Sequence, residues 1–353
     1  YPAEFMAAVM SSELQNTDKV VTLIEECRAM ELPLTYPDVN TGEYMFTVNE
    51  CNEIVYGLGA IKGLGEGPIE AIINARREGG PFKNLFDFCR RIDLRKVNKR
   101  ALEALVRSGS FDSMREDRAV LMAAMVEAVK AAEQTAKNND AGFVDMFGDA
   151  APADQAGTDV YSDFRKIRPW SGKQRLDGEK ETLGLYLSGH PIDDYEAEIK
   201  QFCRRRIVDI QPEKQPQLIA GLVIGLRTVK TKRGDTMAIV TLDDRTARIE
   251  ITVFADLYHE CRNKLIKDAI VVIEGEVKHD DYTGGLRVNA NNIASLNEAR
   301  TRFAKALVVH INHHDFGVQF AQQLRDALSP RTKDAGCTVV VEYQSQTAKA
   351  RLK

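Results

Sequence analysis

The spacing of apolar residues changes near residue 216, and this change constrains the fold more than any other feature of the sequence. Up to residue 137, apolar residues recur at helical spacing and are punctuated by glycines. Between residues 216 and 298 they follow β patterning instead. A chain of 353 residues is also long enough for two or three domains. The sequence therefore predicts an α+β multidomain protein.

Composition and apolar patterning divide the chain into five predicted zones: residues 1–50, 51–137, 138–215, 216–298 and 299–353. The first zone has a helical pattern, and the second is helical and rich in glycine. The third is mixed and contains a small, acidic linker at Ala150–Asp163. The last suggests strand, helix and strand, which is typical of a partial α/β domain.

The fourth zone has the element order of an OB-fold β-barrel. Its five predicted strands are Leu218–Val229, Met237–Asp243, Ile249–Val253, Ile270–Val277 and Gly285–Ala290. A helix predicted at Ala255–Ile266 falls between the third and fourth strands, as in that fold. Gly221 and Gly225 suit a first strand that bends sharply to close a small barrel.

Charge and cysteine usage exclude several classes of protein. With 48 Lys and Arg against 52 Asp and Glu, the net charge of −4 excludes a polycation that coats nucleic acid, so a nucleic-acid site must be a local patch. No apolar run approaches the roughly 20 residues of a membrane span. Six scattered cysteines without a CxxC pair favour a cytoplasmic protein with reduced thiols. His310, His313 and His314 could form a metal cluster, but no Cys and no clear carboxylate set lies nearby, so we expect surface histidines and no metal site.

A glycine-rich stretch at residues 54–77, IVYGLGAIKGLGEGPIEAIINARR, is typical of a helix-hairpin-helix motif. We expect a short helix around Gly59–Lys62, a break at Gly63-Leu64-Gly65, and a second helix from Gly67-Pro68. Two glycines beside a helix start expose backbone N–H groups that can hold a DNA phosphate, and Lys62 and Arg76 add charge. The alternative is a helical packing unit that binds nothing.

A second helical pair follows at Asn84–Ile92 and Val97–Arg107, with Gly109 as the expected C-terminal cap. Cations lie at the joint and its flank, and Lys96, Lys99 and Arg100 are candidates for a second contact with the DNA backbone. A solvated basic face is the alternative.

Several motifs resemble the bacterial replicative DNA polymerase III alpha subunit, and they occur in that family's order along nearly the whole chain. They are Tyr1–Phe5, Tyr56–Gly63, Asn98–Glu103, Ser108–Asp112 and Glu181–Pro191. The resemblance implies the C-terminal region of that subunit. Its parts are the end of the fingers domain (1–50), a tandem helix-hairpin-helix domain (51–137), a clamp-binding peptide and linker (138–215), an OB domain (216–298) and the start of a tau-binding domain (299–353).

The resemblance also implies a DNA-directed DNA polymerase, a nucleotidyltransferase of DNA replication, whose palm carboxylates hold two Mg²⁺ ions. No Asp-x-Asp pair occurs in this chain. We therefore expect the catalytic palm and its Mg²⁺ upstream of Tyr1, with no catalytic residue and no cofactor in this segment. Expected partners are duplex and single-stranded DNA, the sliding clamp (beta subunit) and the tau subunit of the clamp loader. Contacts with the proofreading epsilon subunit are expected outside the segment.

The resemblance assigns the sliding-clamp motif to the segment Phe143-Val144-Asp145-Met146-Phe147. The family motif has a leading Gln, two variable positions, an aliphatic residue and Phe, and here Phe143 stands in the place of Gln. We expect Met146 and Phe147 to enter an apolar pocket on the clamp, with Phe143 and Asp145 beside them. The alternative is that these apolar residues fold back onto the preceding helix, Arg118–Lys137.

The loops of the predicted OB domain are candidates for binding single-stranded DNA. Arg227, Lys230, Lys232 and Arg233 supply charge for phosphates, and Tyr282 is an aromatic platform for base stacking. One aromatic residue predicts weak, salt-sensitive binding, and an OB domain that docks protein is the alternative.

Two further functions stay open at this stage. One is the same region of a specialised error-prone repair polymerase, which the absence of Gln at position 143 favours. The other is a non-polymerase DNA-binding module that joins hairpin and OB domains.

Overall fold

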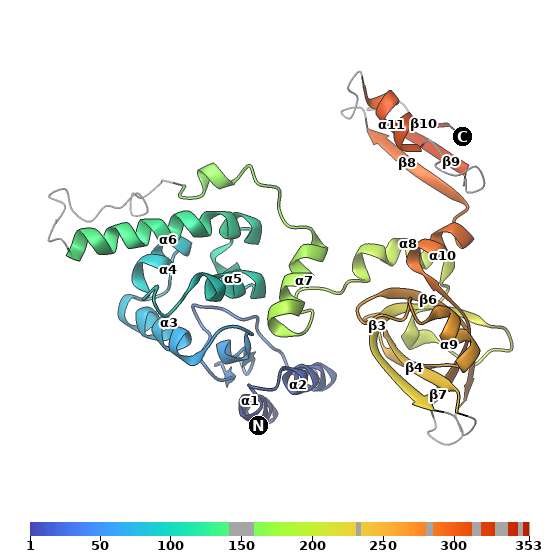
Figure 1. Cartoon of the computed structure of the whole chain (residues 1–353), viewed down its shortest axis with the longest axis horizontal. Helices are drawn as coiled ribbons and strands as arrows, with labels where there is room; N and C mark the ends of the chain where they lie inside the picture. The colour runs from blue at the N-terminus through green and yellow to red at the C-terminus, as the bar shows by residue number, and fades with distance from the viewer. Residues whose placement is uncertain are drawn as a thin grey trace. The chain divides into compact units, whose positions relative to one another are not determined.

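The computed structural model describes residues 1–140, 159–230, 234–279, 285–312, 319–328, 338–344 and 349–352. The chain divides into two compact units, Tyr1–Pro191 and Ile192–Lys353 (Figure 1). Residues 159–191, from the predicted linker zone, belong to the first unit. The boundaries of the five predicted zones remain predictions.

The first unit is helical. Its α-helices are α1 (Pro2–Ser12), α2 (Thr17–Ala29), α3 (Glu66–Gly79), α4 (Leu85–Arg91), α5 (Lys99–Ser108), α6 (Arg118–Asp140) and α7 (Gly172–Leu183). A two-stranded sheet pairs β1 (Thr47–Val48) with β2 (Ile54–Val55). The 3-10 turns are Leu58–Ala60, Asp112–Met114 and Ser162–Phe164.

Aromatic residues form the centre of this unit's core. The ring of Phe88, on α4, meets the rings of Phe82 and Phe111 edge-on, at centroid distances of 4.8 and 5.0 Å. Tyr161 lies in the segment that leads to α7, and its hydroxyl accepts a hydrogen bond from the N–H of Leu85. The segment that leads to α7 is therefore tied to the helical core.

The second unit contains a closed five-stranded barrel in the order β3-β4-β5-β7-β6. The strands are β3 (Gln217–Lys230), β4 (Thr236–Asp243), β5 (Arg248–Val253), β6 (Ile270–His279) and β7 (Leu286–Ser295), and α9 (Ala255–Cys261) lies between β5 and β6. Parallel pairing of β5 with β7 closes the barrel. The register of β3 against β4 shifts between Val223 and Gly225, which is where the sequence predicts a bend.

Short elements flank the barrel. Before it come α8 (Glu196–Phe202) and the 3-10 turns Asp193–Tyr195 and Ile207–Asp209, and after it comes α10 (Leu296–Phe303). A three-stranded sheet then follows in the order β10-β9-β8, from β8 (Ala306–Asn312), β9 (Thr338–Gln344) and β10 (Lys349–Leu352), with α11 (Phe320–Leu328) between β8 and β9. The predicted α+β fold class, with a helical part followed by an OB barrel, is confirmed.

Two predicted helices differ from the observed ones. The helix expected at Ala255–Ile266 ends at Cys261, where the backbone N–H of Lys264 bonds to the Cys261 carbonyl in a turn. The helix expected around Gly59–Lys62 is only the 3-10 turn Leu58–Ala60. The N–H groups of Leu58 and Gly59 donate to the carbonyls of Glu43 and Tyr44, so this backbone pairs with another segment instead of forming an α-helix.

Candidate nucleic-acid interface

The turn Gly63-Leu64-Gly65 presents bare backbone at the start of α3. Leu64 is buried and anchors the turn, while both glycines are exposed. Gly63 has a φ of +85°, which favours glycine, and a Cβ built at Gly63 would meet no atom within 4 Å. Gly65 is the N-cap of α3 and provides no side-chain cap. The first N–H groups of the helix are thus left to other acceptors, such as a phosphate oxygen.

The glycines just before this turn have a different role. A Cβ at Gly57 would lie 2.7 Å from the backbone nitrogen of Phe46, and one at Gly59 would lie 2.7 Å from the carbonyl oxygen of Tyr44. Backbone atoms cannot move aside as a flexible side chain can. Gly57 and Gly59 therefore permit close packing inside the unit, whereas a Cβ at Gly63 would face open space and one at Gly65 would meet only Pro68, at an ordinary 3.9 Å.

Lys62 and Arg76, both predicted to add charge at this hairpin, lie in different environments. Lys62 is exposed, and its backbone N–H donates to the Thr182 carbonyl at the end of α7. The Arg76 side chain is only 12% exposed and forms an ion pair of 2.6 Å with Glu43. It also donates to two backbone carbonyls in the segment before β1, those of Val39 and Gly42. Arg76 holds that segment in place, and we do not include it among the candidate DNA contacts.

The second hairpin joins α4 to α5 and carries exposed cations. Val97 is buried as its anchor, and the side chain of Asn98 caps α5 by accepting a hydrogen bond from the N–H of Ala101. All three predicted cations are exposed here. Lys96 lies in the loop between the helices, and Lys99 and Arg100 lie at the start of α5. Gly109 ends α5 in the left-handed conformation, at a φ of +83°, as predicted.

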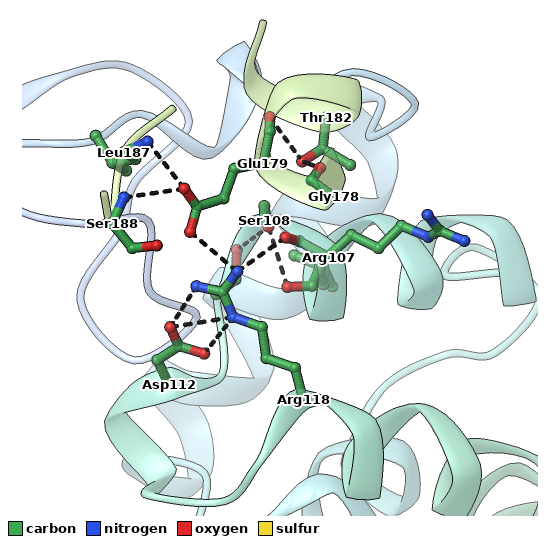
Figure 2. A network of polar contacts seen from close by, with 11 residues as sticks. Arg107, Ser108, Asp112, Arg118, Gly178, Glu179, Thr182, Leu187 and Ser188 are labelled. Atoms are coloured by element: carbon green, nitrogen blue, oxygen red, sulfur yellow. Dashed lines mark hydrogen bonds and ion pairs between the residues drawn. The ribbon is translucent and has the colours of Figure 1, made fainter. Parts of the chain in front are cut away.

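A buried polar network fastens α7 to the hairpin helices (Figure 2). Arg118, at the start of α6, forms ion pairs with Asp112 at 2.6 Å and with Glu179 of α7 at 3.1 Å. Burial by itself lowers the pKa of Arg118, but the hydrogen bond and charge of Asp112 and the charge of Glu179 outweigh it, so this pKa is raised. The sequence pattern gave no signal for this pair, because its members are 61 positions apart.

The same Glu179 carboxylate fixes the chain beyond α7. It accepts hydrogen bonds from the N–H groups of Leu187 and Ser188, at 2.8 and 2.9 Å (Figure 2). Leu187 and Ser188 belong to the motif Glu181–Pro191 that carries part of the sequence resemblance. Glu179 therefore ties α7 both to Arg118 and to the chain that follows the helix.

The structure describes only part of the predicted OB site. Arg227, on β3, is exposed and pairs with Glu250 of β5 at 2.9 Å, and Lys230 is exposed at the end of β3. Lys232, Arg233 and Tyr282 lie outside the described residues, as do the clamp-motif residues Phe143, Asp145, Met146 and Phe147.

Buried cysteines are poor candidates for chemistry. Burial raises the pKa of Cys89 and of Cys203 to about 12, so both thiols stay protonated near neutral pH. Over the described ranges, no three His, Cys, Asp or Glu side chains are grouped to hold a metal ion. His310 instead lies 3.3 Å from Glu342 on the neighbouring strand. Within the same ranges, no helix is long and apolar enough to cross a membrane.

Comparisons with known proteins agree with both parts of this architecture. A family model described as a helix-hairpin-helix motif matches residues 31–121, and one described as an OB-fold nucleic acid binding domain matches residues 218–296. The second OB-fold domain of replication protein A from Methanococcus maripaludis covers 26% of this chain and 93% of its own length. Its identity of 23% and TM-score of 0.20 are too low to support a functional conclusion.

Curated relatives match the chain over its whole length. DNA polymerase III subunit alpha of Pseudomonas fluorescens is 50% identical over 100% of this chain and 31% of its own length. The corresponding subunit of Escherichia coli (strain K12) is 44% identical over 100% of this chain and 30% of its own length. The resemblance predicted from the sequence is confirmed, and the chain spans about a third of the length of these relatives.

Proposed function

We propose that this chain, related throughout to about a third of the DNA polymerase III alpha subunit, is the DNA-binding and clamp-tethering C-terminal region of such a replicative polymerase. The whole subunit would be a DNA-directed DNA polymerase of the cytoplasm, with its palm and Mg²⁺ upstream of this segment. The whole-length identity with alpha subunits favours this function over a non-polymerase module. The sequence identity argues less strongly against a repair polymerase of the same family. The presence of Phe143 in place of Gln in the clamp motif favours that alternative.

The observation that carries DNA binding is the exposed Gly63-Leu64-Gly65 turn at the uncapped start of α3. Its bare N–H groups and the positive end of the helix suit one phosphate. Lys96, Lys99 and Arg100 on the second hairpin offer charge for further phosphates. Such contacts are independent of base sequence, as a polymerase that copies any template requires. The exposed Arg227 and Lys230, with Lys232, Arg233 and Tyr282, would guide the single-stranded template.

The experiment is a titration of this chain with a labelled DNA duplex over a range of salt concentrations. The variant Lys96→Ala/Lys99→Ala/Arg100→Ala should lose at least about tenfold in affinity, and its salt slope should fall by about 2–3, because each phosphate contact contributes about 0.9 to that slope. The control Lys19→Ala/Lys130→Ala/Lys137→Ala removes three exposed lysines from the same unit, with the same change in net charge. Equal losses in both variants would show that only overall charge matters and would overturn the hairpin contact.

A further inference from the structure

A stretch of the first unit between the Ser162–Phe164 turn and α7 is strongly basic. Residues 164–176 read FRKIRPWSGKQRL, with five cations and no acidic residue. We call residues Lys166–Arg175 the basic segment. Its cations beyond the anchoring Arg165 are Lys166, Arg168, Lys173 and Arg175. Neither hairpin includes this stretch, and the predicted functional sites do not include it.

The protein fixes the backbone of the basic segment at both ends. On the N-terminal side, Arg165 forms ion pairs with Glu116 and Asp159. On the C-terminal side, the Ser171 side chain caps α7 in a reciprocal pair with Gln174, and Leu176 is buried. Between them, Trp170 packs against the core of the first unit. The segment is thus an ordered part of the surface, which reduces the entropy cost of binding a ligand.

The four cations of the segment are exposed and have no ion pair with an acidic side chain in the described part of the chain. Arg165 and Arg76, in the same unit, are both paired with acids. Four like charges within ten residues repel one another, and an anion bound beside them relieves this repulsion. An extended polyanion can contact several of them together.

Helix α7 connects the basic segment to the first hairpin. It begins at Gly172 and ends at Leu183, next to the hairpin, where the Thr182 carbonyl accepts a hydrogen bond from the N–H of Lys62. A Cβ at Gly184, just after the helix, would lie 3.7 Å from the Lys62 ammonium group. A helix of 12 residues is about 18 Å long, so one rigid rod separates the two basic sites by about five base pairs of duplex.

We propose that the basic segment is an additional phosphate-binding site for duplex DNA, held by α7 at a fixed distance from the first hairpin. The inference rests on the proposed function, because it assumes that the hairpin lies on the same duplex. Lys166, Arg168, Lys173 and Arg175 contact phosphates, and Trp170 lies among them. An acidic protein surface is the other ligand that four cations could take.

Trp170 makes a local test feasible, because it is the only tryptophan in the chain. Duplex DNA should change its fluorescence in a saturable way, with the same midpoint as binding measured from labelled DNA. The variant Lys166→Ala/Arg168→Ala/Lys173→Ala/Arg175→Ala should lose at least about tenfold in affinity and about 3–4 in salt slope. The control Lys19→Ala/Lys83→Ala/Lys130→Ala/Lys137→Ala removes four exposed lysines of the first unit and should stay close to the parent chain.

The outcomes separate this inference from the proposed function. If the basic-segment variant binds DNA like its control while the hairpin variant does not, the inference fails and the hairpin contact stands. If the basic-segment variant loses affinity and the hairpin variant does not, the inference stands and the hairpin contact fails. If neither variant is weakened, both fail. Equal binding of DNA by parent and basic-segment variant, together with a loss of binding to polyglutamate, would assign the segment to an acidic protein and overturn the inference.

Discussion

At the scale of single residues, burial separates the charges that hold the fold from the charges that can bind a ligand. Lys62 and Arg76 belong to the same glycine-rich stretch, residues 54–77, Lys62 just before its turn and Arg76 in the last turn of α3. Yet the guanidinium of Arg76 is satisfied by Glu43 and two backbone carbonyls, while Lys62 is exposed. Sequence spacing indicates that cations are near a hairpin, but only tertiary contacts determine which of them remain available.

Glu179 is a buried charge that holds the fold, so its removal should destabilise the first unit. Glu179→Ala would leave Arg118 with one carboxylate partner and would deprive two backbone N–H groups of their acceptor. Removing one partner of a buried ion pair costs about 3–5 kcal/mol, and we expect the free energy of unfolding of the first unit to fall by that amount. Urea denaturation measures it.

Glu181→Ala is a matched control, two positions away on the same helix. Glu181 pairs with Arg107, but both side chains are substantially exposed, at 65% and 41%. Loss of an exposed pair costs about 0–1 kcal/mol. A similar loss of stability in both variants would mean that Glu179 is not the fastening point of α7.

At the scale of elements, the helix-hairpin-helix motif uses glycine for two opposite purposes. Gly57 and Gly59 allow two backbone segments to approach, and Gly63 and Gly65 leave backbone uncovered. These two uses look identical in the sequence GLGAIKGLG, because both need a residue without a side chain.

Alanine substitution separates the two uses. Gly57→Ala forces a Cβ against the backbone of Met45 and Phe46, and overpacking of this kind costs about 1–3 kcal/mol. Gly65 has an ordinary φ of −84°, and its Cβ would meet only the Cδ of Pro68 at 3.9 Å. Since Gly65 is an N-cap, where Gly is preferred over Ala, Gly65→Ala should lower the free energy of unfolding by less than about 1 kcal/mol. Comparison of the two melting curves tests this, and equal destabilisation would contradict it.

Most elements of the barrel were predictable because period-2 patterning and turn residues are local signals. The five predicted strands match β3–β7 within a few residues at most ends, and β7 extends five residues beyond the predicted Ala290. The prediction of a helix around Gly59–Lys62 was wrong, because backbone pairing with residues 43–44 overrode the local preference. The Arg118–Glu179 pair involves residues far apart in sequence. The lack of ion pairs at the four cations of the basic segment, within the described residues, also depends on tertiary contacts, which one sequence does not reveal.

At the scale of the whole molecule, the proposed functions are distributed along the chain. The hairpins and the basic segment belong to the first unit, and the barrel belongs to the second. The proposed clamp motif, Phe143–Phe147, occupies a stretch outside the described residues, between α6 and the Ser162–Phe164 turn. If the clamp encircles the same DNA, several weak contacts act together through effective concentration, so none of them has to be strong alone.

The clamp contact is the part of this scheme that only the sequence motif supports, and titration of the chain with purified sliding clamp tests it directly. We expect binding at about micromolar strength or better, and at least a hundredfold loss in Met146→Ala/Phe147→Ala, because two hot-spot side chains contribute about 2 kcal/mol or more each. Val144→Ala, at a variable position of the motif, should bind like the parent chain. Phe143→Gln should bind more tightly, because it restores the polar anchor of the family motif. If neither the parent nor Phe143→Gln binds, the tether is absent, and the repair-polymerase alternative becomes the better account of this chain.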